Sequence, residues 1–328
     1  MRTSVLACAA MFSAGIICGS SAASAVELNV TQFGIGMYGV PYAVAVEKGY
    51  FREIGLDVTG FLTSAGGGTT IRNVLASDLP YGEVSLPAAL VALKQGLKLS
   101  IIHGGVARGT DQLWVTRKDD DSIKKPEDLK GKKIGFSGPN GVTDILSSIM
   151  LDRYHLKDSV QRRAVGAVGA GLTALREGAI DATYMFQPAW DREKDKYRLA
   201  FSSSVFAPRV MQTVGIVRTD YLKEKPELFR GIIAARRKGV EFIQQHPDEA
   251  AAIMAKYYKM DVGQAKEALG FILGADPNYW SNGEFDYEGM DVLVKGLQLI
   301  NTLPPGPYDW SKVIDEDYLP KDLRRTKH

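Results

Sequence analysis

Hydrophobic and polar positions follow two different rhythms along the chain. Short runs with a period of two, such as residues 56–62 and 97–103, predict half-buried β-strands. Stretches with a helical period follow several of these strands, whereas four consecutive helices are expected beyond residue 218. Strands that alternate with helices predict an α/β fold with mostly parallel sheets. The four late helices are predicted over 226–245, 248–259, 262–273 and 287–302.

The strand–helix alternation forms two series. A charge run over residues 117–121 interrupts the rhythm, and we place the first crossing between two lobes there. A solvated turn is the other interpretation of such a run, and it is compatible with a crossing. The predicted strands are 28–33, 56–62, 81–85, 97–103, 112–116, 132–136, 162–165, 181–185 and 213–218. The predicted division is lobe 1 over 26–116 and 215–303, lobe 2 over 117–214, and an irregular tail over 304–328.

A glycine run joins a predicted strand to a predicted helix at residues 64–70, Ser-Ala-Gly-Gly-Gly-Thr-Thr. Glycines let the backbone approach a bound group, and the free N–H groups of a helix N-terminus favour acceptor or negatively charged atoms. Alone, such a run is more often an ordinary flexible turn, since no Lys-Ser/Thr pair completes a phosphate loop. A second glycine-bearing polar loop at 137–143 again follows a strand, and this repetition favours a ligand cradle. The candidate residues in these loops are Ser64, Gly66, Gly67, Thr69, Ser137, Asn140 and Thr143.

Other strand ends carry further candidate binding residues. Tyr38 and Tyr42 flank Pro41, which is favoured in the first turn of a helix, although packing in the core explains both tyrosines equally well. Ser85 stands at an N-cap position, and His103 ends a strand, although a lone histidine is more often structural. The strand over 181–185 is followed by Phe186, Gln187 and Trp190.

The N-terminus has the pattern of a secretory signal peptide. Arg2 precedes an apolar stretch of small residues over 5–18, and Ala23-Ser24-Ala25 forms a small-residue cleavage site. We predict cleavage after Ala25 and a periplasmic protein. A membrane anchor needs about 20 strongly apolar residues, more than this stretch offers. A lipoprotein is disfavoured because Cys18 follows Ile17 instead of a small residue.

Composition narrows the function further. Both cysteines, Cys8 and Cys18, lie in the predicted leader, so disulfides and thiolate chemistry are excluded for the mature chain. The 40 basic and 38 acidic residues are nearly balanced, which gives no indication of a nucleic-acid partner. The four histidines are scattered without metal-ligand spacing, and no catalytic constellation is visible. We therefore expect no metal, no cofactor and no enzymatic activity.

Three motifs resemble a known group of proteins. They are Lys48-Gly49-Tyr50-Phe51 with Gly55-Leu56-Asp57-Val58, the stretch Asp-Leu-Lys-Gly-Lys-Lys-Ile-Gly over 128–135, and Gly178-Ala179-Ile180-Asp181-Ala182 with Pro188. The chain is similar in these motifs to type II periplasmic solute-binding proteins of the nitrate/sulfonate/taurine and thiamine-precursor group. The motifs follow one another in order over nearly the whole mature chain, and they identify the group better than the ligand.

This resemblance implies two α/β lobes, each a mostly parallel sheet flanked by helices, with two crossing strands as a hinge that closes on the ligand. It implies a monomer that delivers its solute to an inner-membrane ABC permease with its ATPase. The contact loops it implies lie around Tyr38 and Tyr42, at 64–69, at Ser85, at 137–143 and at Phe186-Gln187. Many relatives have an acidic residue where this chain has Gln187, whose amide both donates and accepts.

The expected function is capture of a small organic solute, such as a sulfonate or carboxylate. Arg72 or Arg108 could supply a counter-charge, unless they simply face solvent. An aromatic or heterocyclic ring could be sandwiched by Tyr38, Tyr42, Phe186 and Trp190. The alternatives are a thiamine-pyrimidine-precursor binding protein, an enzyme on the same scaffold, which would resemble relatives having a cysteine-rich motif, and a ligand-sensing adaptor for a membrane receptor.

Overall fold

The structure is a computed structural model that describes residues 24–64 and 66–325. The predicted leader falls almost wholly outside these residues, which include only its last two positions, Ser24 and Ala25, at the start of the first strand. None of the described helices is long and apolar enough to cross a membrane.

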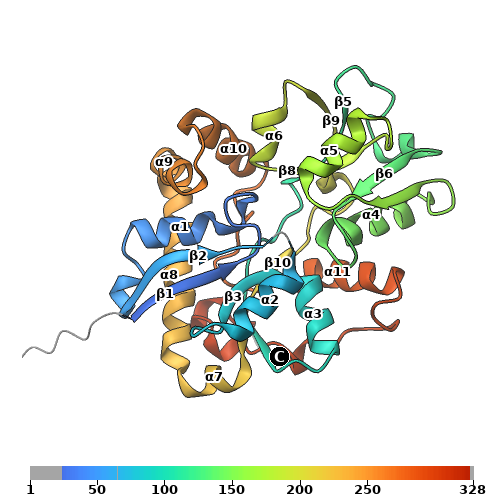
Figure 1. The fold of residues 1–328 in the computed structure, drawn as a ribbon. Helices are drawn as coiled ribbons and strands as arrows, with labels where there is room; N and C mark the ends of the chain where they lie inside the picture. Colours follow the sequence, from blue (N-terminus) through green and yellow to red (C-terminus); the bar gives the residue numbers. More distant parts are fainter. Residues whose placement is uncertain (1–23, 65, 326–328) are drawn as a thin grey trace, which may run out of the picture.

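The first lobe is built on a five-stranded sheet with the order β2-β1-β3-β10-β4 (Figure 1). Strand β1 is parallel to its neighbours β2 and β3, while β10 lies antiparallel between β3 and β4. Strands β2, β3 and β10 occupy the residues predicted for them. The five strands are β1 (Ser24–Val30), β2 (Leu56–Leu62), β3 (Tyr81–Ser85), β4 (Leu99–Gly104) and β10 (Thr213–Arg218).

The second lobe combines two smaller strand groups. Strand β5 pairs antiparallel with β8 on one side and β9 on the other, and β6 pairs parallel with β7. A parallel bridge from Ile134 to Ala182 connects the two groups. The strands are β5 (Gln112–Arg117), β6 (Lys133–Phe136), β7 (Gln161–Ala164), β8 (Thr183–Phe186) and β9 (Tyr197–Ser202). The predicted two-lobed α/β class is confirmed, and β9 is a strand that the sequence pattern did not reveal.

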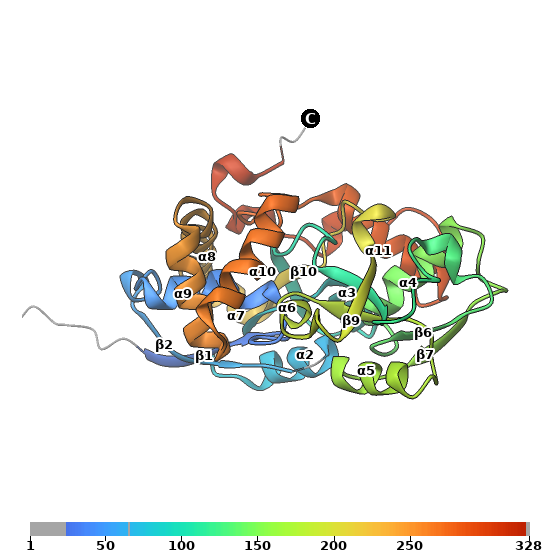
Figure 2. The ribbon, with the colours of Figure 1, turned by 90° about the horizontal axis from the view of Figure 1, so that it is seen from above.

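Helices flank both sheets, and Figure 2 shows α8, α9 and α10 at one end of the molecule and α4 with β6 and β7 at the other. Their bounds are α1 (Val40–Glu47), α2 (Gly67–Ala76), α3 (Leu86–Lys94), α4 (Val142–Arg153), α5 (Val168–Arg176), α6 (Ala189–Glu193), α7 (Thr219–Glu224), α8 (Pro226–Gln245), α9 (Pro247–Tyr258), α10 (Val262–Ala275) and α11 (Tyr287–Leu299). The glycine-bearing stretch 166–171, which follows the predicted strand 162–165, is partly helical because α5 begins at Val168.

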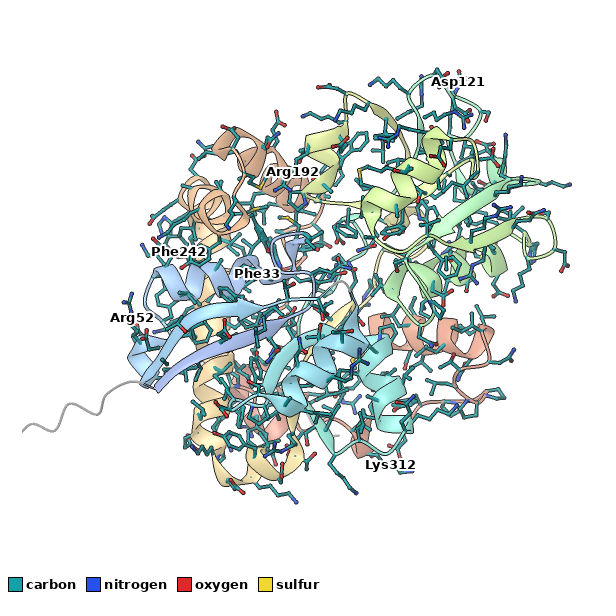
Figure 3. All side chains as sticks on the ribbon, in the orientation of Figure 1. Phe33, Arg52, Asp121, Arg192, Phe242 and Lys312 are labelled. Atoms are coloured by element: carbon teal, nitrogen blue, oxygen red, sulfur yellow. The ribbon has the colours of Figure 1, made fainter. Side chains whose placement is uncertain are left out.

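The chain crosses between the lobes earlier than the charge run suggests. Strand β5 pairs only with β8 and β9 among the described strands, so it belongs to the second lobe, and the first crossing segment is 105–111. The return segment is 203–212, and the two segments bond to each other, with Gln212 N donating to Val106 O at 2.7 Å. The charge run is instead a solvated turn, with Asp121 at the periphery of the lobe (Figure 3).

The C-terminal helices contact both lobes. Helix α11 packs against α4 so closely that a Cβ on Gly296 would lie 2.2 Å from Ile145 Cγ2. On another side, Lys194 beside α6 forms an ion pair with Glu267 of α10 at 2.5 Å. The tail beyond α11 also returns to the first sheet, since Ile101 N donates to Val313 O. The predicted irregular tail is therefore packed against strand β4.

Candidate functional site

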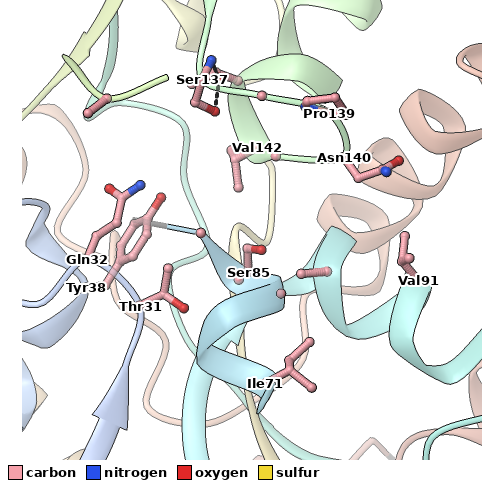
Figure 4. A pocket seen from close by; sticks show the side chains of 18 of the residues that line it. Thr31, Gln32, Tyr38, Ile71, Ser85, Val91, Ser137, Pro139, Asn140 and Val142 are labelled. Carbon is pink, nitrogen blue, oxygen red and sulfur yellow. Dashed lines mark hydrogen bonds between the residues drawn. The ribbon is translucent and has the colours of Figure 1, made fainter. Parts of the chain in front are cut away.

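A cavity of about 690 Å³ lies between the two lobes, within the range of small-molecule sites. The first lobe contributes the turn after β1, the N-terminus of α2 and one face of α3. The second lobe contributes the loop over 137–143, residues 166–168 and the end of β8. Figure 4 shows Gln32 and Tyr38 on one side, Asn140 and Val91 on the other, and Ser85 between them. We call this cavity the cleft.

The structure brings together at the cleft eight of the predicted site residues, which come from five separate segments of the chain. Arg72, proposed as a counter-charge, also lines it. The eight are Tyr38, Gly66, Gly67, Ser85, Ser137, Asn140, Thr143 and Phe186.

Ser64 and Thr69 support the cleft instead of lining it. The Ser64 hydroxyl lies 2.7 Å from that of Thr70 and donates to Gly66 O at 2.8 Å. Thr69 accepts a hydrogen bond from Arg72 Nη2 at 2.8 Å. Both side chains therefore hold the glycine loop and the arginine that borders the cleft.

Tyr42 and His103 were predicted at the cleft, and the structure corrects both placements. Both are fully buried in the first lobe. Tyr42 lies in α1, which is apolar over most of its length and packs against α8, and His103 lies in β4, which pairs with β10. The hydroxyls of Tyr42 and Tyr81 lie 2.7 Å apart, and Tyr81 OH lies 2.8 Å from His103 Nε2. Burial, together with the nearby positive charge of Arg236, lowers the pKa of His103 to about 4. The alternative of core packing was right for Tyr42, as was a structural role for His103.

Gln187, Trp190 and Arg108 also lie away from the cleft. Gln187 is fully buried beyond the end of β8, and Trp190 packs from α6 onto the core between β5 and α5. Arg108 forms ion pairs with Asp276 at 2.6 Å and Asp286 at 3.3 Å, so it is not a counter-charge for the cleft. The proposed four-ring sandwich is thus not assembled. The aromatic side chains that line the cleft are Tyr38, Tyr184 and Phe186.

Four helices begin at the cleft, namely α2, α3, α4 and α5. None of them has a side-chain hydrogen bond at its N-cap, so no side chain caps the first backbone N–H groups. Helix N-termini carry partial positive charge. Among the described residues that line the cleft, Arg72 is the one charged residue. The site thus favours acceptor atoms and negative charge.

Several lining residues were not predicted. Gly166 and Ala167 belong to a loop that the pattern did place after a strand, so the same strand-to-helix signal applies to them. The sequence around the other residues does not indicate a site, because a turn or one face of a buried helix has the same sequence pattern whether or not it borders a cavity. These residues include Thr31, Gln32, Ile35, Gln112, Tyr184, Ala88, Val91 and Ala92.

Beneath the cleft lies a buried polar network. Tyr38 OH donates to Gln212 Oε1 at 2.8 Å, and Gln112 Nε2 donates to the same oxygen at 2.9 Å. Gln212 Nε2 and Gln112 Nε2 donate to the two carboxylate oxygens of Asp111, at 2.6 and 3.1 Å. Burial raises the pKa of Asp111 to about 6, against the lowering effect of hydrogen bonds from Gln212, Tyr279 and Gln112. The network connects both crossing segments to the cleft.

The described residues contain no group of three or more His, Cys, Asp or Glu side chains that could hold a metal ion.

A family model described as "NMT1/THI5 like" matches residues 37–250, well over half of the chain. A protein of Brucella abortus named as a candidate binding protein is 28% identical over 226 residues, 67% of each chain. The formylaminopyrimidine-binding protein of Halalkalibacterium halodurans is 24% identical over 221 residues, 64% of each chain.

Solved structures share the fold at low sequence identity. The periplasmic aliphatic sulphonate binding protein SsuA of Escherichia coli aligns with a TM-score of 0.71 and 13% identity, over 88% of this chain and 97% of that one. The periplasmic nitrate-binding protein NrtA of Synechocystis aligns at 0.68 and 14%, over 90% and 86%. The desulfurization enzyme DSZB aligns at 0.62 and 15%, over 89% and 97%. The fold is that of periplasmic binding proteins, and the same fold also occurs in an enzyme.

Proposed function

Since the chain belongs to the NMT1/THI5-like family, we propose that it is the periplasmic substrate-binding protein of an ABC importer, and that it captures a small organic solute between its lobes. One observation carries this proposal: the cleft draws its walls from both lobes, and four helix N-termini open onto it. A solute held there would contact both lobes at once. Closure about the segments 105–111 and 203–212 would then enclose it.

The chemistry of the walls supports an anionic or strongly polar group on that solute. The uncapped helix N-termini and Arg72 offer donors and positive charge, and no acidic side chain is among the described lining residues. Sulfonates and carboxylates fit this pattern. Tyr38, Tyr184 and Phe186 offer aromatic faces for a ring, so aromatic carboxylates and pyrimidines belong to the same candidate set.

A thermal-shift screen of the purified protein tests this proposal directly. The panel contains alkanesulfonates, aromatic carboxylates and aminopyrimidines, and a binder raises the melting temperature because it stabilises only the folded state. Phe186→Ala removes a cleft-lining ring and should weaken the best binder. Leu199→Ala, on the exposed side of β9, is the control and should bind as the parent does. Turnover of a panel compound without a melting shift would contradict the binding function and support an enzyme.

Transport is a separate step of the proposal. Deleting the gene in the native host should abolish uptake of the radiolabelled compound that binds in the screen. Genes for a permease and an ATPase beside this one would support import, whereas a neighbouring sensor-kinase gene with unchanged uptake would instead support a ligand-sensing adaptor.

A further inference from the structure

The cleft has two chemically different halves. Figure 4 shows Gln32 and Tyr38 at one end, Ser85 in the middle, and Val91 with Pro139 at the other end. A Cβ on Gly67 would lie 2.4 Å from Ser85 Oγ, so α2 and α3 begin side by side in the middle. The half beyond Ser85 is lined mainly by apolar side chains from both lobes, namely Ala88, Val91, Ala92 and Leu97 of the first and Pro139 and Val142 of the second.

One face of α3 forms a wall of this apolar half. Ala88, Val91, Ala92 and Gln95 follow one another at spacings of one, three and four residues that place them along one side of the helix. The face begins in the first turn after Ser85, the N-cap of α3, and it ends at Gln95, the C-cap. From Ala88 to Gln95 it measures about 10 Å, given the helical rise per residue.

The protein leaves part of this apolar surface uncovered. Leu97, just beyond α3, is 36% exposed, and Val91 and Ala88 are partly exposed. A single exposed apolar side chain is common, whereas here apolar side chains of two lobes face one cavity. Covering them would remove apolar surface from water, which is favourable. An apolar part of a ligand in the cleft would provide that cover.

The polar residues of this half lie toward its outer end. Asn140 Oδ1 accepts a hydrogen bond from Thr302 Oγ1 at 2.8 Å, so that oxygen already has a partner in the segment after α11. Gln95 is exposed at the end of α3. A chain that runs along α3 would therefore pass apolar side chains first and reach polar groups and solvent last.

We propose that the bound solute is an amphiphile, whose anionic or strongly polar head lies at the N-termini of α2, α3 and α4 and whose unbranched apolar chain runs along α3 from Ala88 toward Gln95. The inference rests on the proposed binding function and narrows its ligand class. The apolar half accommodates a chain of about eight carbon atoms, since an extended chain of that length measures about 10 Å. A longer chain reaches solvent beside Gln95.

Titration calorimetry with two homologous series tests this inference. One series is ethane-, butane-, hexane-, octane- and decanesulfonate, and the other is propanoate, pentanoate, heptanoate, nonanoate and undecanoate. In at least one series the Kd should fall about threefold for each added methylene, because each is removed from water. The gain should end near octanesulfonate or nonanoate. In the sulfonate series, octanesulfonate should thus bind at least about 30-fold more tightly than ethanesulfonate.

Three variants of the same kind locate the chain. Val91→Asn places a polar amide in the middle of the apolar half and should reduce the ratio of long-chain to short-chain affinity by about fivefold or more. Val91→Leu stays apolar and should retain most of this ratio. Val262→Asn changes a valine that is 43% exposed at the start of α10, outside the cleft lining, and should retain the ratio fully. If Val91→Asn does not fold, Leu97→Asn tests the same half at a more exposed position.

The possible failures are distinguishable. Equal binding of all chain lengths, or binding only of chainless compounds from the thermal-shift panel, overturns this inference and leaves the proposed function intact. A long-chain preference that Val91→Asn keeps in full overturns the path along α3. If neither series nor any compound of the thermal-shift panel binds, the proposed function fails and this inference fails with it.

Discussion

The hydroxyl oxygens of Ser137 and Thr143 lie 2.7 Å apart, and the same relationship recurs in the other lobe between Ser64 and Thr70. In both lobes the serine follows a strand, and the threonine six residues later lies in the first turns of a helix. Each hydroxyl pair closes a glycine-bearing loop and so directs a helix N-terminus to the cleft. Two loops that are distant in sequence thus have the same local structure, a strand-to-helix loop closed by a Ser–Thr hydroxyl pair.

Replacing Thr143 with valine should open the second of these loops. The variant loses the hydroxyl that accepts from Ser137 N at 2.8 Å and pairs with Ser137 Oγ. We expect the free energy of unfolding to fall by about 1–2 kcal/mol, measured by urea denaturation. Thr59→Val is the control, since Thr59 is exposed on β2 and valine is favoured in strands. Equal losses in the two variants would show that the hydroxyl pair has no special role.

Local patterns predicted the elements well and the site in part. Strands β2, β3 and β10 and helix α8 occupy the residues expected from periodicity, and both strand-to-helix loops reach the cleft, because these features depend on near neighbours in sequence. The pairing of β5 with β8 and β9 depends on distant segments, so the crossing was placed too late.

Side-chain partners across long separations were not predictable either. Gln112 and Gln212 are 100 residues apart. Nothing near either residue in the sequence indicates that Gln112 donates to Gln212 Oε1, or that both amides donate to the carboxylate of Asp111. Tyr38 and Tyr42 have similar local surroundings, yet one lines the cleft and the other is in the core. The difference arises from packing against α8, which is far away in the sequence.

The stability of the protein should decrease in mild acid because of His103. Its folded-state pKa of about 4 lies below the usual value of 6.5, so the unfolded state binds a proton more readily. The stabilising contribution is fully present above pH 6.5 and is lost as the pH falls toward 4, with a total of about 3 kcal/mol. Urea denaturation at pH 7.5 and 4.5 measures this loss.

The matched variants for this measurement are His103→Gln and His246→Gln. The first should show a smaller loss between the two pH values, because its side chain does not titrate. The second changes an exposed histidine and should retain the behaviour of the parent. Identical pH profiles for all three proteins would assign the acid sensitivity to carboxylates instead.

Removal of one partner of the buried ion pair between Glu83 and Arg236 should destabilise the protein more than removal of both. Both side chains are buried, with Arg236 Nε donating to Glu83 Oε2 at 2.8 Å. Arg236→Met leaves a buried carboxylate without its cation, and we expect a loss of about 3–5 kcal/mol in the free energy of unfolding. The double variant Glu83→Gln with Arg236→Met should recover part of that loss in chemical denaturation. A double variant less stable than either single one would contradict this explanation.

The cleavage predicted after Ala25 depends on small residues at two positions. Export of the full chain should give a mature protein that begins at Val26, as measured by intact mass of the periplasmic fraction. Ala25→Leu should block or displace the cut, because an Ala-x-Ala site requires small residues on both sides of its centre. Ser24→Leu changes the central position and should be processed normally. Normal processing of Ala25→Leu would place the cleavage site elsewhere.

The glycine loop of the first lobe allows a test at two neighbouring positions. A Cβ on Gly67 would lie 2.4 Å from Ser85 Oγ and 2.5 Å from Ala88 Cβ, so α2 and α3 approach closely only because this residue lacks a side chain. Gly67→Ala must separate the two helices or displace Ser85. We expect a loss of about 1–3 kcal/mol in the free energy of unfolding, together with weaker binding of the best compound from the thermal-shift screen.

Gly68 is the matched control, since a Cβ there meets no atom within 4 Å and the residue lies in the same helix. Gly68→Ala should stabilise the protein by up to about 1 kcal/mol, because alanine favours the helix. Urea denaturation and calorimetry on the two variants distinguish a role in close helix packing from a role in backbone freedom. A similar loss in both variants would indicate that backbone freedom matters throughout the loop. A loss confined to Gly67→Ala would show that close packing of α2 on α3 shapes this wall of the cleft.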